Sequence, residues 1–121
     1  MCTTFDSVDI VDVSYMRLGT SIVTGNLNIT TGEYLLEWGM NVEVGGTTTI
    51  NAGGDVTLDN APNIFGGAVS ITSGTDVIVV DSTPLEMGAS TISGDLTLQS
   101  GGALTQSGAI SVAGNTSLTA G

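Results

Sequence analysis

The sequence predicts an all-β protein that folds as a three-sided parallel β-solenoid. Three observations predict this fold: glycine-flanked segments recur at fixed intervals, apolar and small polar residues alternate inside them, and no apolar stripe with helical spacing is sustained. The intervals of 20 to 21 residues predict coils of that length, and the 121 residues then give roughly six coils. We expect one domain over residues 1–121, with an irregular N-terminal coil over 1–24 and regular repeats over 25–121.

The first strand of each coil lies in a glycine-flanked segment. These segments are GNLNITTG at 25–32, GTTTINAG at 46–53, GAVSITSG at 67–74, GASTISG at 88–94 and GAISVAG at 108–114. Their alternation of period two predicts strands with one buried face. The glycine that opens each segment is expected at a corner where φ is positive. These corner glycines are Gly25, Gly46, Gly67, Gly88 and Gly108.

A second alternating strip follows the first and predicts the second strand of each coil. It reads GDVTLD from Gly54, TDVIVV from Thr75, GDLTLQ from Gly94 and GNTSLT from Gly114, and a looser third segment completes the coil. Because one coil cannot bury its apolar face alone, equivalent positions must stack at about 4.8 Å per coil. The predicted core is Leu27, Ile29, Ile50, Val56, Leu58, Val69, Ile71, Val77, Val79, Ile92, Leu96, Leu98, Ile110, Val112 and Leu118.

The segment 33–38 departs from this alternation. Strict alternation would point Leu35 and Glu37 inward and would bury an unpaired carboxylate. A slip of one residue would instead bury Leu36 and Trp38 and would free both glutamates. We therefore expect a bulge or a corner shift here, with Trp38 either packing locally or serving as a platform on which a sugar stacks.

The run from Gly46 to Gly121 resembles a known family. It contains GGDVTLDNAPNIFGGAVSIT and then LEMGASTISGDLTLQSGGALTQSGAISVAGNTSLTAG, and these segments are similar to the β-strand repeats of filamentous-haemagglutinin-like exoproteins and other large bacterial surface adhesins. The resemblance covers roughly residues 21–121. It implies a right-handed parallel β-solenoid (β-helix), secretion to the cell surface, and a role in adhesion or fibre formation.

The charge balance excludes several classes of function. Twelve acidic residues accompany one basic residue, Arg17, and the chain has no histidine and a net charge of −11. One arginine cannot displace the counterions of a nucleic acid, so we expect no nucleic-acid partner. Neither a histidine base nor a lysine nucleophile is present in the sequence. The longest apolar run is far shorter than the ~18 residues that a membrane helix needs, so we expect no membrane insertion.

Stacking of the repeats predicts an acidic column on the outside of the coils. The column consists of Asp55, Asp76 and Asp95, followed by Asn115. Carboxylates about 5 Å apart repel one another, so the column is expected to form a solvated ridge or to bind calcium weakly through its oxygens. The same two interpretations apply to a second group, which is Asp6, Asp9 and Asp12.

Catalysis by these carboxylates is disfavoured. A glycosidase needs one of its two acids held protonated by an apolar pocket, and the residues that flank this column provide no such enclosure. We therefore expect no enzyme and no cofactor other than calcium.

Small polar residues are predicted to form the outward column of the first strands. This column is Asn28, Thr49, Ser70, Thr91 and Ser111. Flat threonine arrays bind ice in some solenoids, but ladders of hydroxyl and amide groups also stabilise stacked strands by hydrogen bonding to each other. A binding surface for ice, carbohydrate or calcium, or a segment of a viral tail fibre, is therefore the alternative to a structural role.

The last repeat predicts an open end. Leu118 is still in core phase and no capping segment follows it. An uncapped solenoid exposes unpaired backbone groups over an apolar core, so either the chain is part of a longer protein or copies stack head to tail. We expect a structural or adhesive module of an extracellular fibre or surface protein, a head-to-tail homopolymer whose further partners are host or cell-surface glycans.

Overall fold

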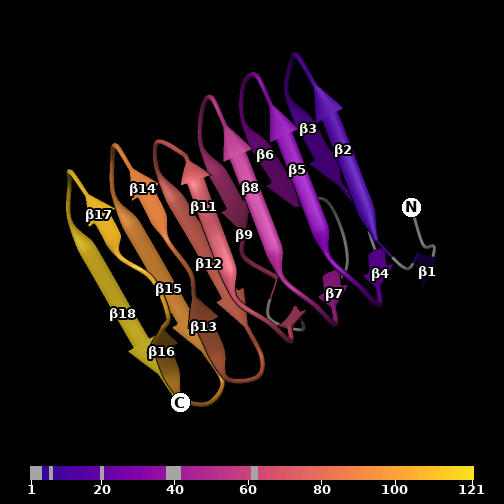
Figure 1. Cartoon of the computed structure of the whole chain (residues 1–121). Helices are drawn as coiled ribbons and strands as arrows, with labels where there is room; N and C mark the ends of the chain where they lie inside the picture. Colours follow the sequence, from indigo (N-terminus) through magenta and orange to yellow (C-terminus); the bar gives the residue numbers. More distant parts are fainter. Residues whose placement is uncertain (1–3, 6, 20, 38–41, 61–62) are drawn as a thin grey trace.

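Eighteen short strands and the turns between them make up the described part of the chain, and none of it is helical (Figure 1). The computed structural model describes residues 4–5, 7–19, 21–37, 42–60 and 63–121. All strand pairs are parallel, and the strands stack in about five turns. The predicted all-β solenoid is therefore confirmed.

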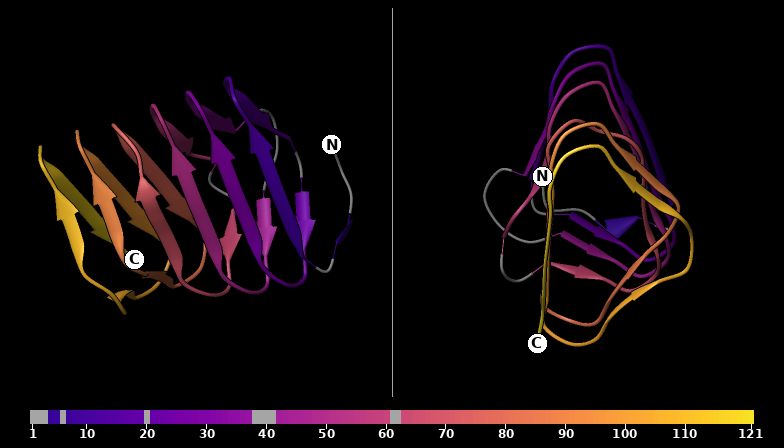
Figure 2. Two further views of the ribbon diagram at one scale, coloured as in Figure 1. Left: turned by 45° about the horizontal axis from the view of Figure 1, so that its top comes forward. Right: turned by 90° about the vertical axis from the view of Figure 1, so that its left-hand side faces the viewer.

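Each coil contributes one strand to each of three faces, and the view along the stack in Figure 2 shows them as the sides of a triangle. The first face contains β1 (Thr4–Phe5), β4 (Ser21–Val23), β7 (Val42–Val44) and β10 (Ile64–Phe65), which form one sheet. In the last two coils β13 (Leu85–Met87) and β16 (Leu104–Gln106) follow them, but these two strands are hydrogen-bonded to the sheet of the second face through the pairing of Val69 with Met87. The second face contains β2 (Val8–Asp12), β5 (Leu27–Thr31), β8 (Thr48–Ala52), β11 (Val69–Ser73), β14 (Ser90–Ile92) and β17 (Ile110–Val112). The third face contains β3 (Met16–Leu18), β6 (Leu35–Glu37), β9 (Val56–Leu58), β12 (Val77–Asp81), β15 (Leu96–Ser100) and β18 (Thr116–Ala120).

The backbone ladders keep equivalent residues in register, so the inward side chains form continuous columns. On the third face, for example, Leu35 pairs with Val56, Val56 with Val77, and Val77 with Leu96. The first coil stacks in the same way, because β2 pairs with β5 at five successive positions. The buried members of the predicted core are Leu27, Ile29, Ile50, Val56, Leu58, Val69, Ile71, Val77, Val79, Ile92, Leu96 and Leu98.

The last coil differs from this prediction. Ile110 and Val112 are only partly buried, and the side chain of Leu118 is 58% exposed. Leu118 pairs with Leu98 in the core column, but β18 has a described partner, β15, on one side only. The prediction that Leu118 is buried in the core is therefore wrong. Its register places it in the core column, but no described strand covers it on the other side.

The stack changes its hydrogen bonding after the fourth coil. Three residues connect β11 to β12 and three connect β14 to β15, but β14 has three residues where β11 has five. In the main ladder of the second face β11 pairs with β13, through Val69 and Met87. β14 pairs with β17 in a separate two-stranded sheet and is linked to the earlier coil by an isolated bridge between Gly74 and Ile92.

The expected slip in segment 33–38 does not occur in β6. Leu35 and Glu37 are buried and Leu36 is half-buried, so strict alternation holds. Leu36 keeps its outward register with Arg17 and Thr57 on the neighbouring coils. The slip prediction is wrong because the buried carboxylate of Glu37 has hydrogen-bond partners, which are described below. Trp38 lies outside the described residues.

The corner glycines serve a different purpose from the one predicted. Gly46, Gly67, Gly88 and Gly108 have no positive φ. Instead, a Cβ on Gly67 would lie 2.5 Å from the carbonyl oxygen of Gly46, the same oxygen that accepts the Gly67 N–H at 3.0 Å. The glycine therefore permits the close approach of stacked backbones.

The two glycine corners Gly67 and Gly88 allow a matched test of this conclusion. Gly67→Ala drives a Cβ into a backbone carbonyl that the ladder fixes in place, and should destabilise the protein by about 2 kcal/mol, as overpacking does. At Gly88 the nearest atom is the hydroxyl of Ser70, which can rotate away, so Gly88→Ala should cost less than about 1 kcal/mol. Urea denaturation of both variants measures the difference in stability. Equal losses of stability would contradict the conclusion that the contact with the neighbouring backbone requires glycine at position 67.

Candidate functional site

One outward column runs along the corner that precedes the third face. It consists of Tyr15, Tyr34, Asp55, Asp76, Asp95 and Asn115, and we call it the corner column. Its backbones are linked from coil to coil: the N–H of Leu35 donates to the carbonyl of Asp55 at 2.8 Å, and the N–H of Val56 donates to that of Asp76 at 2.9 Å. The column is aromatic on the first two coils and acidic on the next three.

The acidic part of the corner column is a hydrogen-bonded ladder. The carboxylate Oδ1 of Asp55 accepts the backbone N–H of Asp76 at 3.1 Å, and Oδ1 of Asp76 accepts that of Asp95 at 2.9 Å. Oδ1 of Asp95 accepts the N–H of Asn115 at 2.8 Å. An asparagine can do the same, since Oδ1 of Asn26 accepts the N–H of Thr47 at 2.9 Å. Each side chain thus satisfies a backbone donor of the following coil, which is a structural use of the acid.

The second acidic group is spread over the first coil. Asp9 is exposed on β2, and Asp6 lies outside the described residues. Asp12 ends β2, and its Oδ1 accepts both the backbone N–H and the hydroxyl of Ser14 at 3.0 Å. These hydrogen bonds, the backbone one first, lower the pKa of Asp12.

Among the described residues, no three acidic or cysteine side chains are grouped so that they could hold a metal ion. Calcium binding by Asp55, Asp76 and Asp95, or by the group around Asp12, stays a prediction.

A pair of stacked tyrosines occupies the first two coils of the corner column. The ring centroids of Tyr15 and Tyr34 lie 5.1 Å apart and the ring planes differ by 8°. The guanidinium carbon of Arg17 lies 5.6 Å from the centroid of the Tyr15 ring. Val13, beside this pair, is 90% exposed. The repeat spacing did not predict this pair, because the coil that links Met16 to its ladder partner Leu35 is shorter than the regular repeat.

A buried polar cluster surrounds Glu37 at the end of β6. Its Oε1 accepts the side-chain N–H of Asn63 at 2.7 Å and the backbone N–H of Asn60 at 3.1 Å, while Oδ1 of Asn63 accepts the N–H of Val42 at 2.8 Å. The other carboxylate oxygen, Oε2, is buried without a hydrogen bond among the described atoms. Burial raises the pKa of Glu37, and the hydrogen bonds from Asn63 and Asn60 oppose that rise.

Asp81 is the other buried acid among the described residues. It ends β12, where its Oδ1 accepts the N–H of Thr83 at 2.9 Å and its hydroxyl at 2.7 Å, and its Oδ2 accepts the N–H of Phe65 at 3.3 Å. Burial raises the pKa of Asp81, while the hydrogen bonds from Thr83 and Phe65 lower it. Both buried acids therefore bind backbone and side-chain donors at the edges of the core.

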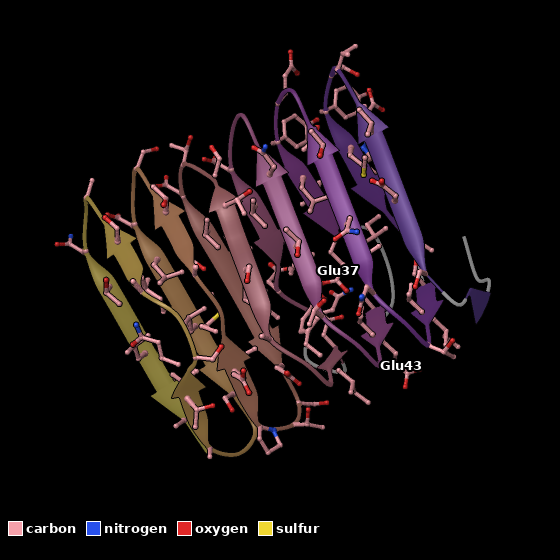
Figure 3. The ribbon with its side chains drawn as sticks, in the orientation of Figure 1. Glu37 and Glu43 are labelled. Carbon is pink, nitrogen blue, oxygen red and sulfur yellow. The ribbon has the colours of Figure 1, made fainter. Side chains whose placement is uncertain are left out.

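The described surface is hollowed at the last coil and on the first face. The larger, of about 440 Å³, opens at the last coil over the core and is lined by Leu98, Leu104, Ile110, Val112 and Leu118, among others. The smaller, of about 250 Å³, lies on the outer side of the first face between Ile22, Glu43 and Ile64. Figure 3 shows Glu37 between the faces and Glu43 on the outside of β7.

The outward column of the second face follows the prediction in two parts. Asn28, Thr49 and Ser70 are in register on β5, β8 and β11, and Thr91 pairs with Ser111 on β14 and β17. The change of hydrogen bonding after the fourth coil separates the two parts, so the array is not one continuous flat surface. No helix that could cross a bilayer was found among the residues described.

The role of the acidic ladder can be tested at Asp76. Asp76→Asn keeps the Oδ1 acceptor and removes one of three like charges, so stability in low salt should be unchanged or slightly higher. Asp76→Ala leaves the N–H of Asp95 without this acceptor and should cost about 1 kcal/mol. Urea midpoints measured with and without calcium check both statements. A calcium-dependent gain that Asp76→Asn abolishes would instead assign the column to cation binding.

The buried carboxylate of Glu37 predicts an unusual dependence of stability on pH. Because its pKa is raised in the folded chain, folding binds a proton there, and this contribution is lost as the pH rises through the folded-state pKa. Glu37→Gln keeps the acceptor for Asn63 and removes the buried charge, so at pH 8 it should stabilise the protein by about 1 kcal/mol. The gain should vanish towards pH 4.

Glu37→Leu is the matched control for the hydrogen bonds of this cluster. Leucine completes the apolar column of Leu18 and Leu58, but it removes the acceptor of Asn60 and Asn63 and should cost about 2 kcal/mol. Urea denaturation from pH 4 to pH 8 separates charge from hydrogen bonding. If the stability of the Glu37→Gln variant depended on pH in the same way as that of the natural chain, the pH dependence could not be assigned to Glu37.

Comparison with known proteins identifies the repeat. No curated protein and no solved structure matches the chain. The model of the family described as repeats of unknown function (DUF5649) matches residues 6–72 and 74–121, which include every described strand except β1 and the last residue of β11. Since the matches extend over most of its length, the chain belongs to the DUF5649 family of repeats.

Proposed function

We propose that the chain is a structural, non-catalytic module of an extracellular fibre or surface protein, in which solenoids stack head to tail. The open face of the last coil carries this proposal. Leu118 is 58% exposed although it pairs in core register with Leu98, and the hollow of about 440 Å³ beside it is lined mainly by apolar side chains. An apolar surface with an unpaired strand edge favours the addition of another β-coil.

The first coil has the complementary edge. Among the described strands, β2 and β3 each have one partner, β5 and β6. Val8 and Ile10 on the first coil are partly buried apolar residues, as are Ile110 and Val112 on the last. Stacking of a first coil on a last coil therefore places apolar residues on apolar residues and continues the parallel ladder.

The chemistry of the outer surface is consistent with a fibre. The carboxylates of Asp55, Asp76 and Asp95 accept backbone N–H groups, which is a structural use, and the net charge of −11 opposes side-to-side aggregation. The resemblance to repeats of surface adhesins favours an extracellular location, with host or cell-surface glycans as partners of the assembled fibre.

Head-to-tail stacking predicts fibres of the purified chain with strands perpendicular to the fibre axis and a repeat of about 4.8 Å along it. Leu118→Asp places a charge on the open core face and should shift the chain to monomers in sedimentation velocity at concentrations where the natural chain polymerises. Electron microscopy of the same samples should show fibres only for the natural chain.

Ser117→Asp is the matched control, because Ser117 points outward from the same strand and the charge change is identical. This variant should still form fibres. A natural chain that is monomeric at high concentration would contradict the proposal. Loss of polymer in both variants would also contradict it, since the added negative charge alone would then explain the loss.

A further inference from the structure

The stacked tyrosines have no role in the proposed fibre, and their geometry is unusual for exposed side chains. Tyr15 and Tyr34 are the only tyrosines of the chain and belong to successive coils. Their rings lie nearly parallel, with centroids 5.1 Å apart, and the side chains are 45% and 36% exposed. Two phenol rings are thus held face to face where solvent and small reagents reach them.

The backbone holds the two rings together independently of the aromatic contact. The N–H of Met16 donates to the carbonyl of Tyr34 at 2.9 Å, and β3 pairs with β6 in register immediately after the tyrosines. Arg17 lies over the ring of Tyr15 and adds a cation–π contact. The pair is therefore positioned by the solenoid before any reaction takes place, which favours intramolecular chemistry between the rings.

We propose that Tyr15 and Tyr34 form an oxidative cross-linking site that joins the first two coils as a dityrosine. The oxidant is a haem peroxidase with hydrogen peroxide. Each phenol loses one electron and its hydroxyl proton, which gives two tyrosyl radicals. The carbons ortho to the two oxygens then form a carbon–carbon bond, and each ring transfers the hydrogen on that carbon to its oxygen and regains a phenol. The chain loses two hydrogen atoms, and one peroxide is reduced to two water molecules.

The position of the pair favours an internal bond over a bond between chains. The two rings share one corner of one molecule, whereas the net charge of −11 keeps separate molecules apart at low ionic strength. The bond would close the loop from Tyr15 to Tyr34 and so add a covalent link to the ladder between β3 and β6. Hydrogen exchange in β2 and β3 should therefore slow after cross-linking.

The sequence supplies a direct assay. Arg17 is the only basic residue, so trypsin cuts the chain once, between Tyr15 and Tyr34. After peroxidase treatment of dilute protein, cleaved and denatured chains should stay joined as one species with dityrosine fluorescence. Its mass should equal that of the chain minus two hydrogens plus one water. Untreated chains should separate into two fragments.

Three variants test whether the internal cross-link depends on the two tyrosines being neighbours in the corner column. Tyr34→Phe should lose the internal product. Tyr15→Phe combined with Asp55→Tyr places a new pair on the next two coils of the corner column, so fluorescence should return while trypsin now releases residues 1–17. Tyr34→Phe combined with Thr97→Tyr keeps two tyrosines but separates them, and should give no internal product.

The proposal is overturned if the natural chain yields only cross-linked dimers, or if the variant carrying Thr97→Tyr cross-links internally as well as the natural chain. It is also overturned if the cleaved fragments separate despite the fluorescence. These results concern monomeric, dilute protein, so they are independent of whether the chain forms fibres.

Discussion

Each coil of this protein has a buried interior only because the coils on either side of it cover its inward residues. The parallel ladders determine which residues cover which: Leu27 meets Thr48 on the second face, and Val56 meets Val77 on the third. The effect is visible along a single column: Leu98 has a coil on both sides and is 2% exposed, whereas Leu118 has a coil on one side and is 58% exposed. Burying such a side chain contributes roughly 2 kcal/mol, so the stability of each coil depends on its neighbours.

The same stacking determines which residues the corners and the outer columns can hold. At Gly67 the backbone of the preceding coil is so close that a side chain would strike its carbonyl. In the corner column, the repeat brings side chains of one kind together on successive coils. The aspartates accept backbone N–H groups from the next coil, and the two tyrosine rings stack on each other. Acidic side chains that would repel one another in a flexible chain are thereby given a structural use.

The repeat made most of the fold predictable. The phase of the glycine-flanked segments and the alternation inside them identified the solenoid, its three faces and twelve buried core residues, because register in a stacked coil follows directly from sequence spacing. The alternation also placed Glu37 inward, but the hydrogen-bond partners that allow its burial were not predictable in this way, since Asn60 and Asn63 come from the following coil, 23 and 26 residues away. The tyrosine pair was missed for a related reason: its coil is shorter than the repeat. Where a coil deviates in length, sequence spacing no longer identifies the neighbours.

The distance between equivalent outward residues two coils apart tests in-register stacking most directly. Asn28 and Ser70 both pair with Thr49, from opposite sides. Spin labels attached to Asn28→Cys and Ser70→Cys, in a chain that also carries Cys2→Ser, should lie about 10 Å apart with a narrow distribution, which is twice the spacing of neighbouring strands. A broad distribution centred beyond about 20 Å would contradict the solenoid register and every column derived from it.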